Sequence, residues 1–216
     1  MHGVSMQQAK RAVQLALQGL QPSDRFNVIE FNSSTTALFK RSQPVNAATR
    51  AEASAFVKRL QANGGTEMRP ALALALDSPP SEQHLRQVIF VTDGSVGYED
   101  ELFSMIEDRL GNARLFTVGI GSAPNSWFMR KAAEAGRGSY TFISALHEVQ
   151  EKMADLFQKL EQPQVTNIEV HWPSSVVTDS FPSVVPDLYL GEPVTVKVAA
   201  SEQPQDQHVV RISGNS

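Results

Sequence analysis

Asp93 is the residue whose position best fits a role in chemistry. It lies just after an unbroken apolar run, residues 88–91, and just before Gly94 and Ser95. Such a run is typical of a strand covered on both faces of a parallel sheet. In open α/β sheets, ligands bind just beyond the carboxyl ends of the strands. The position therefore predicts that the Asp93 carboxylate contacts a metal ion or ligand. A turn with a helix-capping Asp explains the same residues.

Thr66 is a second candidate, because it ends a polar loop that contains Gly64 and Gly65. The glycines would let this loop approach an ion or change its position, although an ordinary loop with a pair of glycines is a fair alternative.

Other motifs in the chain do not make a catalytic site. Residues 119–121 read Gly-Ile-Gly but lack the third glycine of a dinucleotide-binding fingerprint. His147 and Glu148 lie in a helical pattern without the second His of a zinc protease, so they are interpreted as solvated surface. Ser95 is not in a nucleophile elbow, since Asp93 holds the place of the first glycine. We therefore expect that the protein is not an enzyme.

Composition excludes several further classes. The chain has 216 residues, a net charge of −4, 41% hydrophobic and 19% charged residues, and no cysteine. Disulfides, thiol catalysis and Cys-ligated zinc are therefore excluded, and nothing indicates a nucleic-acid surface. No apolar run is long enough to span a bilayer, so an integral membrane protein is not expected. The start of the chain reads as a helix rather than as a signal peptide.

Hydrophobic periodicity predicts alternating helices and strands, which favour a mostly parallel, doubly wound sheet. Capping boxes are predicted at Ser5 with Gln8 and at Thr49 with Glu52. The predicted helices cover 5–20, 49–60, 70–76, 100–110, 127–135 and 146–160, and the predicted strands cover 26–31, 36–40, 88–92, 114–120 and 139–143.

The composition changes at Gln162 and Pro163, after which no helical periodicity remains. Strands are predicted at 165–172, 194–200 and 209–212, with prolines between them. We therefore predict an α/β domain over residues 1–161 and a short β-rich tail over residues 162–216.

Four segments in order carry a resemblance to a known family: QAKRAVQLALQGLQPSDRFNVIEF, FVKRLQANGGTEMRPALALAL, VIFVTDGSVGYEDELF and RLFTVGIGSAPN. Together they resemble a von Willebrand factor type A domain, and are similar in particular to inter-alpha-trypsin inhibitor heavy chains and their bacterial relatives. The likeness covers about three-quarters of the chain. It implies a three-layer, Rossmann-like α/β fold, and the tail resembles the segment that follows the domain in those proteins.

The resemblance also implies a metal-ion-dependent adhesion site (MIDAS) for Mg²⁺, or for Mn²⁺ or Ca²⁺. In the family, an Asp-x-Ser-x-Ser segment, a Thr and a later Asp supply its ligands, and a carboxylate of the partner completes the metal shell. Thr66 matches the Thr and Asp93 matches the later Asp. The Asp-x-Ser-x-Ser segment is not found, so a site of Thr66 and Asp93 alone is expected to be weak.

The first strand of the family is also missing from the sequence, which would leave the strands at 26–31 and 88–92 with unpaired backbone groups. We expect a tail strand, 194–200 or 209–212, to fill this gap. The strand would come from the same chain or from a second copy, which would make a homodimer by strand exchange. Direct pairing of 26–31 with 88–92 is the alternative.

The expected function is metal-dependent binding of a protein or an extracellular matrix ligand. The alternative is a structural role, without metal, in assembling a secreted or surface protein. The family likeness implies an extracytoplasmic location, whether secreted, periplasmic or on the cell surface. Metal-dependent binding of a carboxylate separates the first function from the second.

Overall fold

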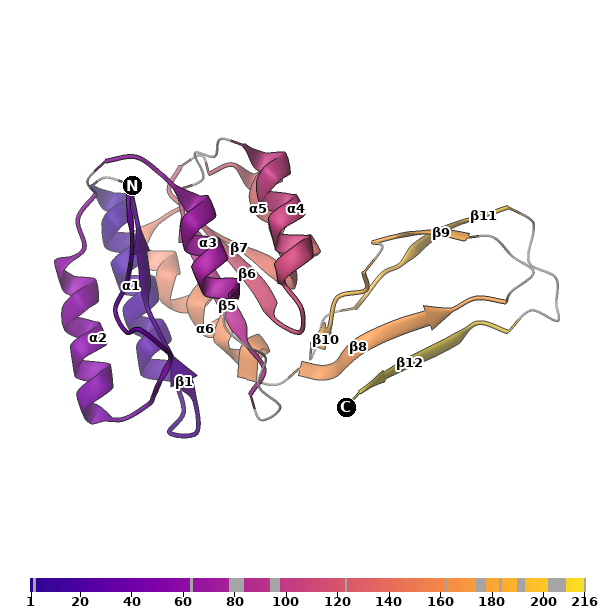
Figure 1. Cartoon of the computed structure of the whole chain (residues 1–216), viewed down its shortest axis with the longest axis horizontal. Helices are drawn as coiled ribbons and strands as arrows, with labels where there is room; N and C mark the ends of the chain where they lie inside the picture. Colours follow the sequence, from indigo (N-terminus) through magenta and orange to yellow (C-terminus); the bar gives the residue numbers. More distant parts are fainter. Residues whose placement is uncertain are drawn as a thin grey trace. The chain divides into compact units, whose positions relative to one another are not determined.

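The computed structural model describes residues 1, 3–62, 64–77, 84–93, 98–122, 124–161, 163–173, 178–182, 184–189, 193–201 and 209–215 (Figure 1). The chain forms two compact units, Met1–Phe157 and Gln158–Ser216, and each is described by itself. None of the helices in the described part is both long and apolar enough to cross a membrane.

A parallel three-stranded sheet forms the centre of the first unit. Its order is β5 (Gln87–Thr92), β6 (Arg114–Ile120) and β7 (Arg137–Ile143). Every residue of β6 is buried, as in a strand covered on both faces. In β5, for which the apolar run predicted such cover, only Phe90 and Thr92 are buried. Parallel neighbours need a crossover connection, and α4 (Glu99–Arg109) and α5 (Ser126–Ala135) provide it.

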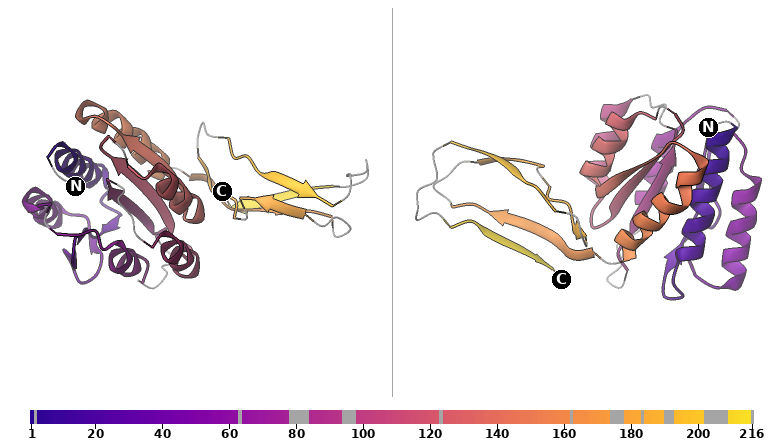
Figure 2. Two further views of the ribbon diagram at one scale, coloured as in Figure 1. Left: turned by 90° about the horizontal axis from the view of Figure 1, so that it is seen from above. Right: turned by 180° about the vertical axis from the view of Figure 1, so that it is seen from behind.

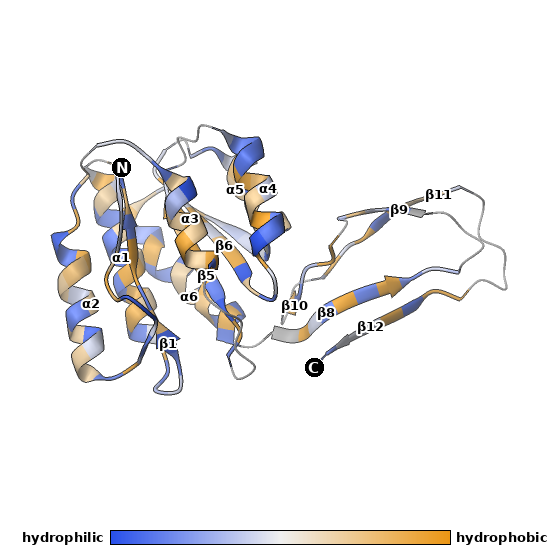
Figure 3. Ribbon diagram, viewed as in Figure 1, coloured by the Kyte–Doolittle hydropathy of each residue, from blue (hydrophilic) through white to orange (hydrophobic). Residues whose placement is uncertain are grey.

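Helices cover both faces of this sheet. Figure 2 shows α3 (Met68–Leu76), α4 and α5 on one side, with α1 (Val4–Gly19) and α6 (Val149–Glu161) on the other. Figure 3 shows hydrophilic and hydrophobic turns alternating along α2 (Ala47–Arg59) and α4, as in helices with one buried face. The predicted three-layer α/β fold is confirmed.

The strand predicted at 26–31 is interrupted. It is divided into β1 (Arg25–Phe26), paired with β4 (Gln43–Pro44), and β2 (Ile29–Phe31), paired with β3 (Thr35–Ala37). The Asn27 side chain explains the break: its Oδ1 accepts hydrogen bonds from Val28 N at 2.9 Å and from Phe39 N at 3.0 Å. A side chain that bonds neighbouring backbone in this way competes with the strand ladder.

No tail strand in the described part of the chain pairs with β5. Among the described strands, β5 pairs only with β6, and β2 pairs only with β3. Insertion of a tail strand from the same chain and direct pairing of the two strands were therefore wrong predictions. The tail strands instead pair antiparallel with other tail strands. Filling of the gap by a second copy stays a prediction.

Both predicted capping boxes were wrong. The N-cap of α1 is Gly3, which has no side chain to accept a bond, so Ser5 and Gln8 do not cap the helix. At α2 the box lies three residues earlier than predicted: Asn46 Oδ1 accepts from Thr49 N at 3.0 Å, and Thr49 Oγ1 accepts from Asn46 N at 3.1 Å. Thr49 is thus the third residue of the helix and not its cap.

The second unit consists of strands from two small antiparallel sheets. One has the order β10 (Leu188–Tyr189), β8 (Pro163–His171) and β12 (Arg211–Asn215). The other pairs β11 (Lys197–Ala200) with β9 (Thr178–Phe181). The three predicted tail strands are confirmed, with shifted ends. The position of the domain boundary stays a prediction.

Candidate metal and ligand site

Asp93 directly follows β5, so its carboxylate lies at the carboxyl end of the parallel sheet. The side chain is 31% exposed, and its Oδ2 lies 3.0 Å from the α-amino nitrogen of Met1. Residues 94–97, which follow it, lie outside the described part. The Asp93 carboxylate therefore has a cation as its neighbour, at a place open enough to admit a ligand.

The start of α1 lies at the same edge. A Cβ built on Gly121, which follows β6, would lie 2.9 Å from Ser5 Oγ near the beginning of α1. Gly121 also has a φ of +95°, which side chains rarely adopt. The close approach of Ser5 and the backbone turn both require glycine here, and they hold the start of α1 beside the ends of the central strands.

The loop that carries Thr66 is bound to the turn after β2. Gly65 N donates a hydrogen bond to Ser33 Oγ at 2.7 Å, and Glu67 N donates to the Asn32 carbonyl at 2.8 Å. Gly64 has a φ of +82°. Figure 1 shows this loop, the start of α1 and the start of α4 at the same end of the unit. Thr66 itself is exposed.

Acidic and aromatic side chains surround this end. The first turn of α4 holds Glu99, Asp100 and Glu101, as suits the positive end of a helix dipole. Glu99 Oε1 accepts a hydrogen bond from Asn125 Nδ2 at 2.6 Å, which ties α4 to the start of α5.

Two aromatic side chains at the same end are open to a partner. Tyr98 is 82% exposed and Trp127 is 56% exposed. The Trp127 ring packs edge-on against Phe103, with ring centroids 5.7 Å apart. Sequence reasoning missed Tyr98, and its only signal was a place among loop residues between Asp93 and a helix.

The donors present at this edge match a hard cation but are few. Thr66 and Asp93 offer a hydroxyl and a carboxylate, which suit Mg²⁺. Within the described residues, no group of three or more His, Asp or Glu side chains could hold a metal ion. The residues therefore fit a weak site in which water fills most of the metal shell.

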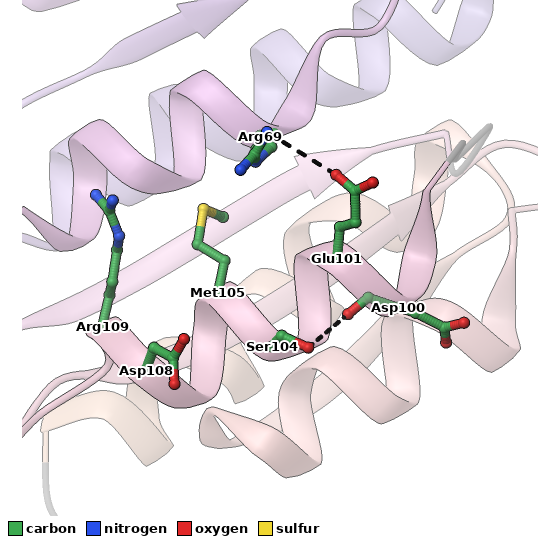
Figure 4. Close-up of a pocket in the computed structure, with 7 residues that line it drawn as sticks. All are labelled: Arg69, Asp100, Glu101, Ser104, Met105, Asp108 and Arg109. Carbon is green, nitrogen blue, oxygen red and sulfur yellow. Dashed lines mark hydrogen bonds and ion pairs between the residues drawn. The ribbon is translucent and has the colours of Figure 1, made fainter.

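A shallow pocket of about 430 Å³ lies between α3 and α4 and includes neither candidate residue (Figure 4). Arg69 at one end lies 3.9 Å from Glu101, and Arg109 lies 3.8 Å from Asp77. These charges form exposed ion pairs, which contribute little to the stability of the fold. We assign the pocket no chemistry.

Glu148 accepts hydrogen bonds that stabilise the turn before α6. Its Oε2 accepts hydrogen bonds from Ser144 Oγ at 2.8 Å, Ser144 N at 2.9 Å and Ala145 N at 3.1 Å. The bond from the Ser144 hydroxyl, followed by the two backbone bonds, lowers the pKa of Glu148 below its ordinary value. His147 is exposed, as predicted, whereas Glu148 is half-buried and closes the turn η1 (Leu146–Glu148) that leads into α6.

Comparison with known sequences finds one family. A family profile described as "von Willebrand factor type A domain" matches residues 1–142. The chain is 28% identical over 214 residues to "von Willebrand factor A domain-containing protein DDB_G0285981" of Dictyostelium discoideum, covering 99% of this chain and 26% of that protein. It is 29% identical over 186 residues to "von Willebrand factor A domain-containing protein 5B1" of Mus musculus, covering 86% of this chain and 15% of that protein. The chain thus spans about a quarter or less of these relatives.

Solved structures share the fold. A von Willebrand factor type A protein from Catenulispora acidiphila aligns with a TM-score of 0.71 at 22% identity, covering 97% of this chain and 50% of that chain. Proximal thread matrix protein 1 from the mussel byssus, "with zinc occupied MIDAS motif", aligns at 0.53 and 17% identity over 70% of this chain and 39% of that chain. Manganese-loaded TRAP protein of Plasmodium vivax aligns at 0.53 and 20% identity over 90% and 85%. The likeness to inter-alpha-trypsin inhibitor heavy chains stays a prediction.

Proposed function

Because this chain belongs to the von Willebrand factor type A domain family, we propose that it is a protein-binding module rather than an enzyme. A divalent metal ion at the carboxyl end of β5 binds a carboxylate of its partner. The observation that carries this proposal is the place of Asp93. Its carboxylate directly follows the parallel strand β5 and is partly exposed.

Asp93 and Thr66 are the residues that would hold the ion. The Asp93 carboxylate supplies charge, and the Thr66 hydroxyl comes from a loop whose shape is set by Gly64, Gly65 and Ser33. With only one carboxylate among the two proposed ligands, the positive charge of the ion would be incompletely neutralised. That leaves the ion able to attract a carboxylate from another protein. We infer Mg²⁺ as the ion, with Mn²⁺ or Ca²⁺ as substitutes.

Two structural neighbours support the proposal that a protein of this fold binds a metal ion. One is described with zinc in its MIDAS motif and one as loaded with manganese. The partner we propose is a protein or an extracellular matrix component, met at the cell surface, in the periplasm or outside the cell. The exposed Tyr98 and Trp127 would add contact area, since aromatic residues often anchor protein interfaces.

A metal-independent structural role is the second candidate function. One observation favours it: within the described residues, no group of three or more His, Asp or Glu side chains could hold a metal ion. A metal ion held by Thr66 and Asp93 alone would bind weakly. The domain would then serve in assembling a larger secreted or surface protein.

Calorimetric titration with Mg²⁺ and with Mn²⁺ separates the two candidates. The proteins are the wild type, Asp93→Asn, and Asp108→Asn as a matched control on α4. Metal-dependent binding predicts heat of binding in the wild type and in Asp108→Asn, and its loss in Asp93→Asn. Equal binding in all three proteins would contradict the proposed site, and no binding in the wild type would favour the structural role.

A further inference from the structure

Strand β12 is the edge of its sheet. It pairs antiparallel with β8 on one side, and no other described strand pairs with it. All five of its residues are exposed, and Ile212 is 70% exposed. An open edge strand presents unpaired backbone N–H and C=O groups and is a template for pairing with another strand.

The two faces of β12 differ in character. Ile212 lies opposite Val170, whereas Arg211 lies opposite His171 and Ser213 lies opposite Glu169. The polar face is held together by a 3.0 Å contact between His171 Nε2 and Ser213 Oγ. Figure 3 shows the matching alternation of hydropathy along β8. A strand added beside β12 must therefore offer the same alternation.

We propose that β12 pairs antiparallel with β12 of a second copy of this chain, which gives a two-fold symmetric dimer. Placing Ser213 on the two-fold axis lets all five residues pair. The sheet would then run β10-β8-β12 from one copy directly into β12-β8-β10 of the other. Unlike strand exchange into the gap beside β5, this pairing leaves every observed strand pair intact.

The composition of β12 suits a partner identical to itself. In this register Arg211 faces Asn215 of the second copy, so no like charges lie directly opposite each other. Ile212 faces Gly214, which has no side chain and leaves room for the isoleucine. The same surface patch serves both copies, as a two-fold interface requires.

Charge complementation at Ser213 tests the proposal. Ser213→Lys places two cations opposite each other on the axis, and Ser213→Glu places two anions there. Each variant alone is expected to weaken dimerisation by about tenfold or more, and an equimolar mixture to restore it. Ser213→Asn is the neutral control, because it replaces the hydroxyl that contacts His171 by a larger side chain without adding a charge. Sedimentation equilibrium with a metal chelator present gives the dissociation constants independently of any metal site, and circular dichroism checks folding.

Three results would overturn the proposal. A wild type that stays monomeric at its highest soluble concentration excludes the dimer. A dimer that persists in both charged variants uses another surface, such as the gap beside β5. The third result is that the two charged variants do not associate when mixed, although Ser213→Asn dimerises. Ser213 would then not pair with Ser213 of the second copy.

Discussion

The aromatic rings of Phe31 in β2 and Phe90 in β5 stack with centroids 5.2 Å apart and planes 10° from parallel. The two strands belong to separate sheets, so no backbone ladder joins them in the described part. Phe90 is only 5% exposed and belongs to the main apolar core. This ring pair therefore joins two parts of the first unit across the gap.

Replacing Phe90 by Ala is expected to lower the free energy of unfolding by about 3–5 kcal/mol, because it removes a buried ring and leaves a cavity. Urea unfolding followed by circular dichroism measures the change. Phe142→Ala is the control. Phe142 is 40% exposed, so its replacement should lower the free energy of unfolding much less. Equal losses in the two variants would show that Phe90 does not join the two parts.

Gln8 is expected to be a source of instability. Its side chain is 1% exposed, and neither the nitrogen nor the oxygen of its amide has a hydrogen-bond partner. Gln8→Met keeps a similar shape and should raise the free energy of unfolding by about 1–3 kcal/mol, since a buried unpaired polar group is costly. The exposed neighbour Gln7→Met serves as the control in thermal unfolding. A loss of stability in Gln8→Met would reveal a partner for the amide.

Gly138 lets β7 approach β6 closely. A Cβ at this position would overlap the carbonyl oxygen of Leu115 and lie 2.8 Å from its carbonyl carbon. Since backbone cannot move as a flexible side chain does, Gly138→Ala is expected to cost about 1–3 kcal/mol. Gly19→Ala is the matched control, because its nearest neighbour would be the Phe157 ring at 3.7 Å. If both variants unfold at the same urea concentration as the wild type, the strands have room to separate.

Glu148 should make stability depend on pH. Its pKa is lowered in the folded state, so it stabilises the fold above the ordinary value of 4.5, and this contribution is lost as pH falls through the lowered pKa. Glu148→Gln should therefore be less stable than wild type at neutral pH, with the difference shrinking in acid. Urea unfolding at several pH values measures it. A difference that stays constant with pH would mean that the carboxylate charge is not what stabilises this turn.

The local sequence pattern was enough to predict much of the fold. The apolar run before Asp93 and the run now seen as β6 predicted parallel strands, although only β6 is buried throughout, and Pro70 with its alanines predicted α3. Local pattern was not enough for the starts of α1 and α2. Asn46 and Thr49 are both good capping residues, and the choice between them depends on where the preceding strand ends.

The sequence by itself determined the family, the alternation of helices and strands, and the two candidate ligands Thr66 and Asp93. Those features follow from side-chain type and spacing, which are local. Only the tertiary structure decided that, among the described strands, β5 pairs with β6 alone, that the tail strands pair with each other, and that Met1 lies beside Asp93. These outcomes depend on which strand edges and chain segments meet in space. A strand that pairs on one edge and a strand that pairs on both edges can have the same apolar pattern. Periodicity therefore does not reveal which strands are neighbours.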